Sequence, residues 1–146
     1  YELAPCGVRA AGSMLVSEGQ LFFGLPGALW MTDGSEAGTV LLHEFGYHRP
    51  DNLTAANGAI FFTADDSTHG IELWRSNGTP EGTTMLADLS TTWGSNPYDL
   101  TAAGGLLLFH ARRGLHDTHL WVSDGTTRGT RTLDVATQPA APESQR

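Results

Sequence analysis

The chain has 146 residues, the usual size of one domain. Acidic side chains outnumber basic ones by 16 to 8, which gives a formal net charge of −8. This charge repels phosphate backbones, so nucleic acid is not expected as a partner. No apolar run approaches the roughly 20 residues that a membrane-spanning helix needs, so direct membrane insertion is not expected either.

The chain opens with a lead-in, residues 1–11, that contains the single cysteine, Cys6. One cysteine excludes an internal disulfide framework. The whole chain has 18 Gly and 7 Pro and only 16% charged residues. This composition favours short strands joined by tight turns over helices.

Three copies of one pattern follow in chain order. The first motif reads LWMTDGSEAGT at 29–39, LWRSNGTPEGT at 73–83 and LWVSDGTTRGT at 120–130. A second motif, NLTAANGAIFF at 52–62 and DLTAAGGLLLF at 99–109, precedes the later two copies, and a degenerate form at 14–23 precedes the first. The period predicts three units at about 12–47, 48–94 and 95–136, followed by a flexible tail at 137–146.

Each unit is expected to contain four short strands. Asn57-Gly58 and Gly104-Gly105 have the composition of two-residue hairpin turns between the first and second strands. The Leu-Trp segment forms the third strand, and the fourth strands are expected at 39–44, 83–88 and 130–135. Four-stranded antiparallel units of about 45 residues in tandem are typical of β-propeller blades. The predicted fold is therefore all-β, with three blades of β-propeller type.

The turn between the third and fourth strands is predicted to be structural. Its short polar residue can accept hydrogen bonds from nearby backbone N–H groups, and the next residue, glycine, supplies a positive φ. A calcium loop is the alternative, but one copy has an amide in place of the carboxylate. The repeated Trp residues are expected to pack between units, with turn carbonyls as partners for their indole N–H groups. These structural residues are Trp30, Asp33, Gly34, Trp74, Asn77, Gly78, Trp121, Asp124 and Gly125.

The three motifs resemble the bacterial ELWxxDGT repeat (hyalin-like) family. The resemblance covers most of the chain, and it implies a propeller-like fold and an extracytoplasmic location: secreted, cell-surface or periplasmic. The turn is also similar to the Asp-box of sialidase-type propellers, which is structural. The Glu of the family motif is present only at Glu72, since Ala28 and His119 replace it in the other copies. This variation argues against Glu72 as a catalytic carboxylate.

Candidate binding residues lie where the copies differ, in the connections between units. An exposed aromatic beside Asn and Ser is suited to stacking on a sugar or to anchoring a protein. We take as candidate ligand-binding residues Trp93, Asn96, Tyr98, Tyr47 and His48. A loop contains four residues of types that can bind zinc or copper: His110, His116, Asp117 and His119. Because side chains alternate between the two faces of a strand, these four are not expected to meet, and no metal site is predicted.

No nucleophile motif or phosphate loop is present, and neither an enzyme activity nor a cofactor is expected. Three blades are too few for a closed ring, because propellers usually have four to eight. Closure is therefore expected through self-association, a larger assembly, or a longer repeat protein from which this chain derives. The favoured function is a non-enzymatic binding or scaffolding module for protein partners. The alternative is a lectin or adhesin that binds glycans through loop aromatics.

Overall fold

The computed structural model describes residues 13–90 and 92–133. The lead-in, Cys6 and the tail at 137–146 lie outside these residues. The described residues contain no helix and form three four-stranded antiparallel sheets, which confirms the all-β prediction. Accordingly, no helix among them is long and apolar enough to cross a membrane.

Each sheet follows chain order from its first strand to its fourth. Unit 1 consists of β1 (Met14–Ser17), β2 (Gln20–Leu25), β3 (Ala28–Thr32) and β4 (Val40–Glu44). Unit 2 consists of β5 (Asp51–Ala56), β6 (Ala59–Asp65), β7 (Ile71–Ser76) and β8 (Thr83–Ala87). Unit 3 consists of β9 (Tyr98–Ala103), β10 (Leu106–Arg112), β11 (Thr118–Ser123) and β12 (Arg131–Thr132).

The first hairpin of every unit turns through two residues with positive φ. Asn57 and Gly58 have φ values of 51° and 77°, and Gly104 and Gly105 have 58° and 80°. This conformation matches the right-handed twist of the flanking strands. Glu18 takes the same conformation in unit 1, with φ of 52°, although Glu is a poor residue for it.

The last strand of unit 3 is shorter than predicted among the described residues. A strand at 130–135 was expected, whereas β12 covers only Arg131–Thr132, and residues 134 and 135 lie outside the description. Leu133 still donates its backbone N–H to the Leu120 carbonyl at 2.7 Å, so the pairing with β11 extends one residue beyond β12. β4 and β8 differ from their predicted bounds by one residue each, within ordinary end effects.

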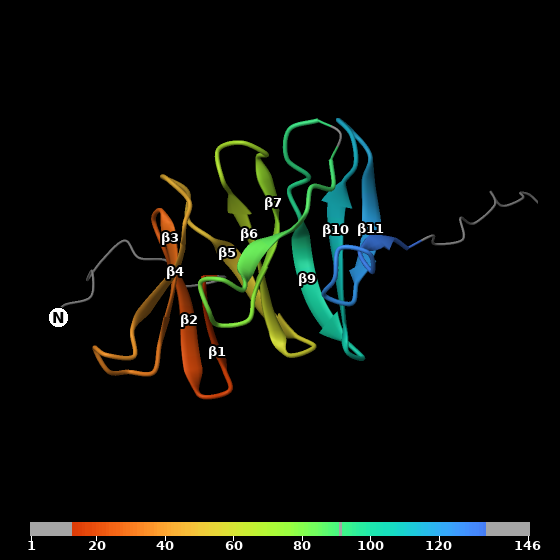
Figure 1. The fold of residues 1–146 in the computed structure, drawn as a ribbon. Helices are drawn as coiled ribbons and strands as arrows, with labels where there is room; N and C mark the ends of the chain where they lie inside the picture. The colour runs from red at the N-terminus through yellow and green to blue at the C-terminus, as the bar shows by residue number, and fades with distance from the viewer. Residues whose placement is uncertain (1–12, 91, 134–146) are drawn as a thin grey trace, which may run out of the picture.

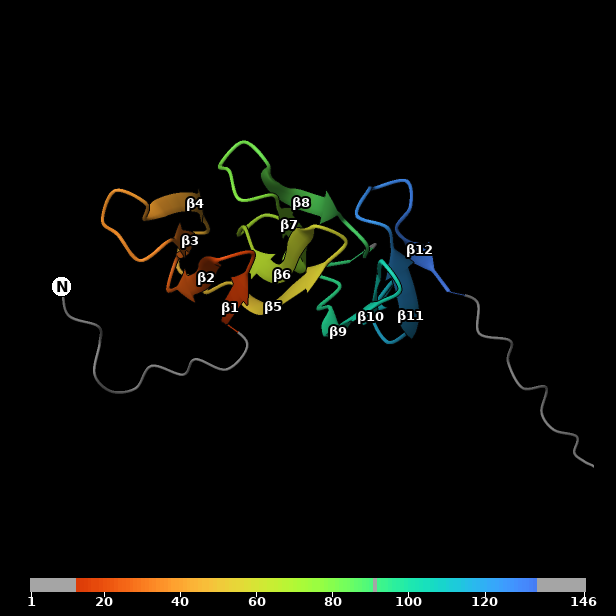
Figure 2. The same ribbon diagram turned by 90° about the horizontal axis from the view of Figure 1, so that it is seen from below.

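The three sheets stand side by side along the molecule (Figure 1). Viewed from below, the first strands β1, β5 and β9 lie along one side and the fourth strands along the other (Figure 2). The core lies between neighbouring sheets. One apolar cluster joins units 1 and 2 around Phe22, Leu42 and Phe62, and a second joins units 2 and 3 around Phe61, Leu73 and Phe109.

Candidate functional site

Each unit closes its third and fourth strands with the same hydrogen-bonded turn. In unit 2 the Asn77 Oδ1 atom accepts from the backbone N–H of Thr79 at 3.0 Å and from its hydroxyl at 2.7 Å. The Thr79 hydroxyl oxygen in turn accepts from the Gly82 N–H at 2.9 Å. The corresponding contacts recur in unit 1 with Asp33 and Ser35, and in unit 3 with Asp124 and Thr126. The same oxygen is thus committed to the turn whether it belongs to a carboxylate or to an amide.

Two glycines make this turn possible. Gly78 has a φ of 93°, and its counterparts Gly34 and Gly125 have 98° and 97°. At Gly82 a Cβ would collide with the Asn77 side chain, and the same collision would occur at Gly38 and Gly129. Hydrogen bonds from Ser35 lower the pKa of Asp33, so this carboxylate is ionised and held by its own turn.

The three repeated Trp residues occupy one sequence position but different environments. Trp74 is 5% exposed and packs on unit 1, with its ring centroid 4.9 Å from that of Phe45. Trp121 is 7% exposed and lies in the cluster that includes Leu73 of unit 2. Trp30 is only half-buried, since the described residues place no unit on that side of unit 1.

The indole N–H groups do not bond as expected from the sequence. Trp121 donates Nε1–H to the carbonyl of Ala111 on the neighbouring strand β10, at 3.2 Å, and not to a turn carbonyl. The prediction is wrong here because the ring lies across β10 next to Phe109, 6.2 Å between centroids. The Nε1 atom of Trp74 is buried and has no hydrogen-bond partner among the described residues.

Glu72 is a fully buried carboxylate that anchors the connection between units 2 and 3. Its Oε1 atom accepts from the Ser95 hydroxyl at 2.6 Å and from the Leu89 N–H at 3.2 Å, while Oε2 accepts from the Ser95 N–H at 2.9 Å. Burial, with a smaller contribution from the charge of Asp88, raises the pKa of Glu72 to about 7. These three hydrogen bonds tie Glu72 to the connection between units 2 and 3.

The connection between units 1 and 2 is held without such a carboxylate. The Gly27 N–H donates to the His48 carbonyl at 3.0 Å, and the Phe45 N–H donates to the Gly27 carbonyl at 2.7 Å. These backbone contacts explain why Ala28 suffices at the position of Glu72. The repeat alignment shows that the Glu can be replaced in the other copies. It does not predict that Glu72 bonds to Leu89 and Ser95.

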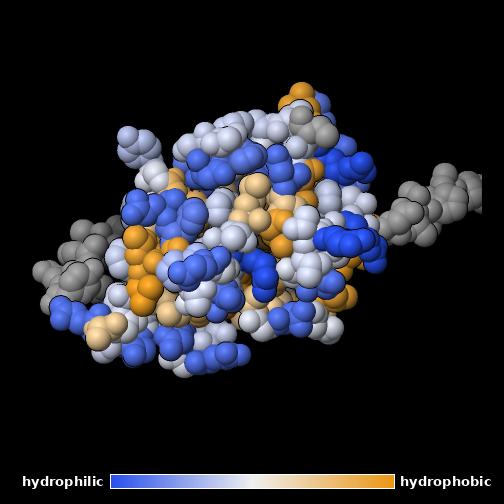
Figure 3. All heavy atoms as spheres, viewed as in Figure 1, coloured by the Kyte–Doolittle hydropathy of each residue, from blue (hydrophilic) through white to orange (hydrophobic). Residues whose placement is uncertain are grey.

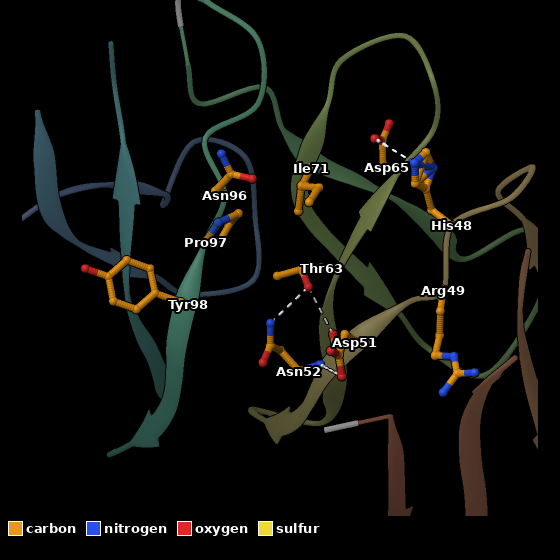
Figure 4. A pocket seen from close by; sticks show the side chains of 10 residues that line it. All are labelled: His48, Arg49, Asp51, Asn52, Thr63, Asp65, Ile71, Asn96, Pro97 and Tyr98. Carbon is orange, nitrogen blue, oxygen red and sulfur yellow. Dashed lines mark hydrogen bonds and ion pairs between the residues drawn. The ribbon is translucent and has the colours of Figure 1, made fainter. Parts of the chain in front are cut away.

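A cavity of about 410 Å³ lies where both connections approach unit 2 (Figure 4). The Thr63 hydroxyl accepts from Asn52 Nδ2 at 3.1 Å and donates to the Asp51 carbonyl at 3.2 Å, and His48 Nε2 lies 3.5 Å from Asp65 Oδ2. The wall therefore combines these polar groups with a larger apolar surface, to which Ile71 and Pro97 contribute. The lining residues are His48, Arg49, Asp51, Asn52, Thr63, Asp65, Ile71, Asn96, Pro97 and Tyr98.

The structure brings together three of the five predicted ligand-binding residues. His48, Asn96 and Tyr98 line the cavity, but the Tyr98 ring points away from Ile71 (Figure 4) and stacks on His110 at 5.1 Å. Trp93 and Tyr47 are 59% and 92% exposed and do not belong to its lining. The Trp93 indole instead lies against Gly70, where an added Cβ would come within 3.1 Å of Nε1.

The histidines near the ends of β10 and β11 lie beside separate carboxylates. His119 Nε2 lies 3.3 Å from Asp117 Oδ2, and His110 Nδ1 lies 3.4 Å from Asp99 Oδ2. In the described part of the chain, no group of three or more His, Cys, Asp or Glu side chains is arranged to hold a metal ion.

Units 1 and 3 each leave one sheet face uncovered by any described unit, and the two faces are opposite ones. All seven residues of β6 in unit 2 are buried. In β2 the buried residues are Phe22 and Gly24, whereas in β10 they are Leu107, Phe109 and Ala111. In the repeat alignment, Phe22 corresponds to Leu108, which is only half-buried. Unit 1 therefore exposes the face that unit 3 buries, and unit 3 exposes the face that unit 1 buries.

The exposed face of unit 1, which we call face 1, is apolar. Strand partners in register share a face, and Met14 pairs with Phe23, Phe23 with Trp30, and Trp30 with Leu41. Val16 is 70% exposed and Met14 48%. Hydrophobic side chains gather over unit 1 at the left of Figure 3. Face 1 consists of Met14, Val16, Leu21, Phe23, Leu25, Trp30 and Leu41.

The exposed face of unit 3, which we call face 3, is apolar near the β9–β10 hairpin and polar near the opposite end. Leu108 pairs with Val122, and His110 pairs with Leu120 and, on its other side, with Tyr98. Leu106 is 38% exposed and Tyr98 45%. Face 3 consists of Tyr98, Leu106, Leu108, His110 and Leu120, together with Val122, which is only 6% exposed.

No protein-family model matches this chain, and no curated protein matches it.

Proposed function

We propose that the chain is a non-enzymatic binding and scaffolding module of β-propeller-type units that assembles with other protein surfaces through faces 1 and 3. One observation carries the proposal: the central residues of both faces hold positions that are buried between units inside the chain. These residues are Leu21, Phe23 and Trp30 on face 1 and Leu106, Leu108 and Leu120 on face 3. Trp30 on face 1 corresponds to Trp74 and Trp121, which are at most 7% exposed. Apolar sheet faces of this kind are normally covered.

The proposed location is extracytoplasmic, as the resemblance to the ELWxxDGT repeat family suggests. The net charge of −8 is consistent with recognition of proteins and inconsistent with nucleic acid as partner. Three units fall short of the roughly four to eight blades of a propeller, so the assembly proposed here would supply the missing blades.

Light scattering over a concentration series tests this function. Val16→Asp places a charge on face 1 at a side chain that is 70% exposed in the single chain, so folding should be preserved. Leu115→Asp is the matched control, since Leu115 is 63% exposed in the loop between β10 and β11, outside both faces. We expect the wild type and the control to exceed the monomer mass of 15.6 kDa and Val16→Asp to approach it. A wild type that stays monomeric at every concentration would contradict the proposal.

The cavity favours carbohydrate binding as a second candidate function. Its volume of about 410 Å³ lies in the range of small-ligand sites, and its wall offers carboxylate, amide and hydroxyl groups for sugar hydroxyls. A glycan array probed with wild type, Asn96→Ala and Tyr47→Ala separates this function from scaffolding. Binding that persists in Tyr47→Ala and disappears in Asn96→Ala supports the cavity as a glycan site. If the wild type binds no glycan on the array, the carbohydrate-binding function is rejected and scaffolding remains the proposed function.

A further inference from the structure

We infer that the partner of face 1 is face 3 of a second copy, so that two chains join head to tail and close a ring of six units. This inference rests on the proposed assembly function and specifies its partner and geometry. It follows from how the three units of one chain already pack.

Both interfaces within the chain join the same two kinds of face. Phe62 and Trp74 of unit 2 pack against unit 1. Their contacts there are Phe22, Leu29 and Leu42. Phe109 and Trp121 of unit 3 pack in the same way against unit 2. Their contacts there are Phe61, Leu73 and Leu86. In both interfaces the Trp-bearing face of one unit packs on the preceding unit. The face that it contacts there is the one with the buried Leu of the third strand, Leu29 or Leu73.

Face 1 is the Trp-bearing face of unit 1 and has no preceding unit among the described residues. Phe23 and Trp30 occupy the positions of Phe62 and Trp74 and share a face, since they are register partners. The side chains around them, including Val16, Leu21 and Leu41, are apolar. Face 1 therefore carries the elements that units 2 and 3 use to bind the unit before them.

Face 3 carries the opposite half of such an interface. Leu108 and Leu120 occupy the positions of Phe61 and Leu73, which are 1% and 0% exposed between units 2 and 3. In unit 3 both leucines are half-buried, and Leu106 beside them is 38% exposed. A copy of face 1 placed here would bury Trp30 as Trp74 is buried in the chain.

Pairing of two identical faces is the competing arrangement, and the internal packing argues against it. It would place Trp30 against Trp30, a contact between like faces that neither internal interface uses. Contacts between different faces extend into a filament or close into a ring, according to the rotation between copies. Because the internal units already follow an arc with their first strands on one side (Figure 2), closure after six units matches the usual propeller size.

A complementation experiment tests the pairing directly. Val16→Asp alters face 1 and Leu106→Asp alters face 3, and both side chains are exposed in the single chain. We expect each variant alone to show a dimer dissociation constant raised at least about 10-fold, because each places a charge beside the apolar contact. An equimolar mixture should regain association, because face 3 of the first variant and face 1 of the second are both intact. Thermal unfolding of each dilute variant checks that it is folded.

The outcomes separate this inference from the proposed function. If Leu106→Asp dimerises like the wild type and mixing does not rescue Val16→Asp, the copies pair through face 1 alone. That result overturns the head-to-tail inference and leaves the assembly function intact. If the wild type does not associate at all, both fail.

Discussion

Strand β6 in unit 2 and its counterparts β2 and β10 have similar sequences but different environments. All seven residues of β6 are buried, whereas β2 and β10 bury alternate residues on opposite faces. The apolar pattern is nevertheless present on both faces of all three strands. The units are therefore built to be covered on two sides, and only unit 2 has a neighbour on each side among the described residues.

Truncation of the equivalent Phe residues should have unequal effects in the middle and outer units. Phe62 is fully buried and Phe23 half-buried. We expect Phe62→Ala to lower the free energy of unfolding by about 3–5 kcal/mol, and Phe23→Ala in dilute single chains to lower it by about half as much. Urea denaturation of both variants measures the difference. Equal losses would mean that unit 1 is covered as completely as unit 2.

Glu72 distinguishes the connection after unit 2 from the connection after unit 1. Because burial raises the pKa of Glu72 from 4.5 to about 7, the fold favours the protonated acid. Its contribution to stability is complete below pH 4.5 and is lost as the pH rises through 7. We expect the free energy of unfolding to be about 2 kcal/mol lower at pH 8 than at pH 5.

Two neighbouring groups and one control complete that experiment. Asp88 is the charged neighbour that adds to the pKa shift of Glu72. Asp66 raises the pKa of His69, so the stabilising contribution of His69 is also lost as the pH rises. Glu72→Gln should remove most of the pH difference, and Glu36→Gln, at an exposed position in the turn of unit 1, should leave it unchanged. If the difference in unfolding free energy between pH 5 and pH 8 remains in Glu72→Gln, its source is His69 and not Glu72.

The turns, in contrast to the faces, should respond equally in outer and middle units. Gly38→Ala and Gly82→Ala each bring a Cβ into the side chain of Asp33 or Asn77, which must release its two hydrogen bonds. We expect each variant to lose about 2 kcal/mol of unfolding free energy. A large difference between the two, measured by urea denaturation, would show that the turn depends on its unit.

The smallest expected effect compares the hairpin turns at the two internal interfaces. Asn57 Nδ2 donates to the Asp124 carbonyl of unit 3 at 3.0 Å, while Glu18 occupies the same turn position in unit 1. Glu18→Asn suits the positive φ and offers the same donor toward unit 2, so we expect a gain of about 0.5–1 kcal/mol. Glu36→Asn, at an exposed turn residue, is the control. No gain in thermal stability would mean that the two interfaces differ in geometry.

The strand order and the tight turns were predictable because the repeats align Trp30, Trp74 and Trp121 and place Asn-Gly or Gly-Gly between strands. Their signals are local, since a turn depends on residues a few positions apart. The partners of Glu72 were not predictable, because Leu89 and Ser95 are distant in sequence and do not repeat. The position of Tyr98 differs for a related reason: the sequence placed it in a connection, whereas it starts β9 and its ring stacks on His110 on face 3.

Sedimentation equilibrium of the wild-type chain measures how many copies cover faces 1 and 3. Head-to-tail pairing predicts a reversible, discrete species of two chains, about 31 kDa from a monomer of 15.6 kDa, without larger filaments. A single monomeric species across the full concentration range, with faces 1 and 3 left in water, would contradict it.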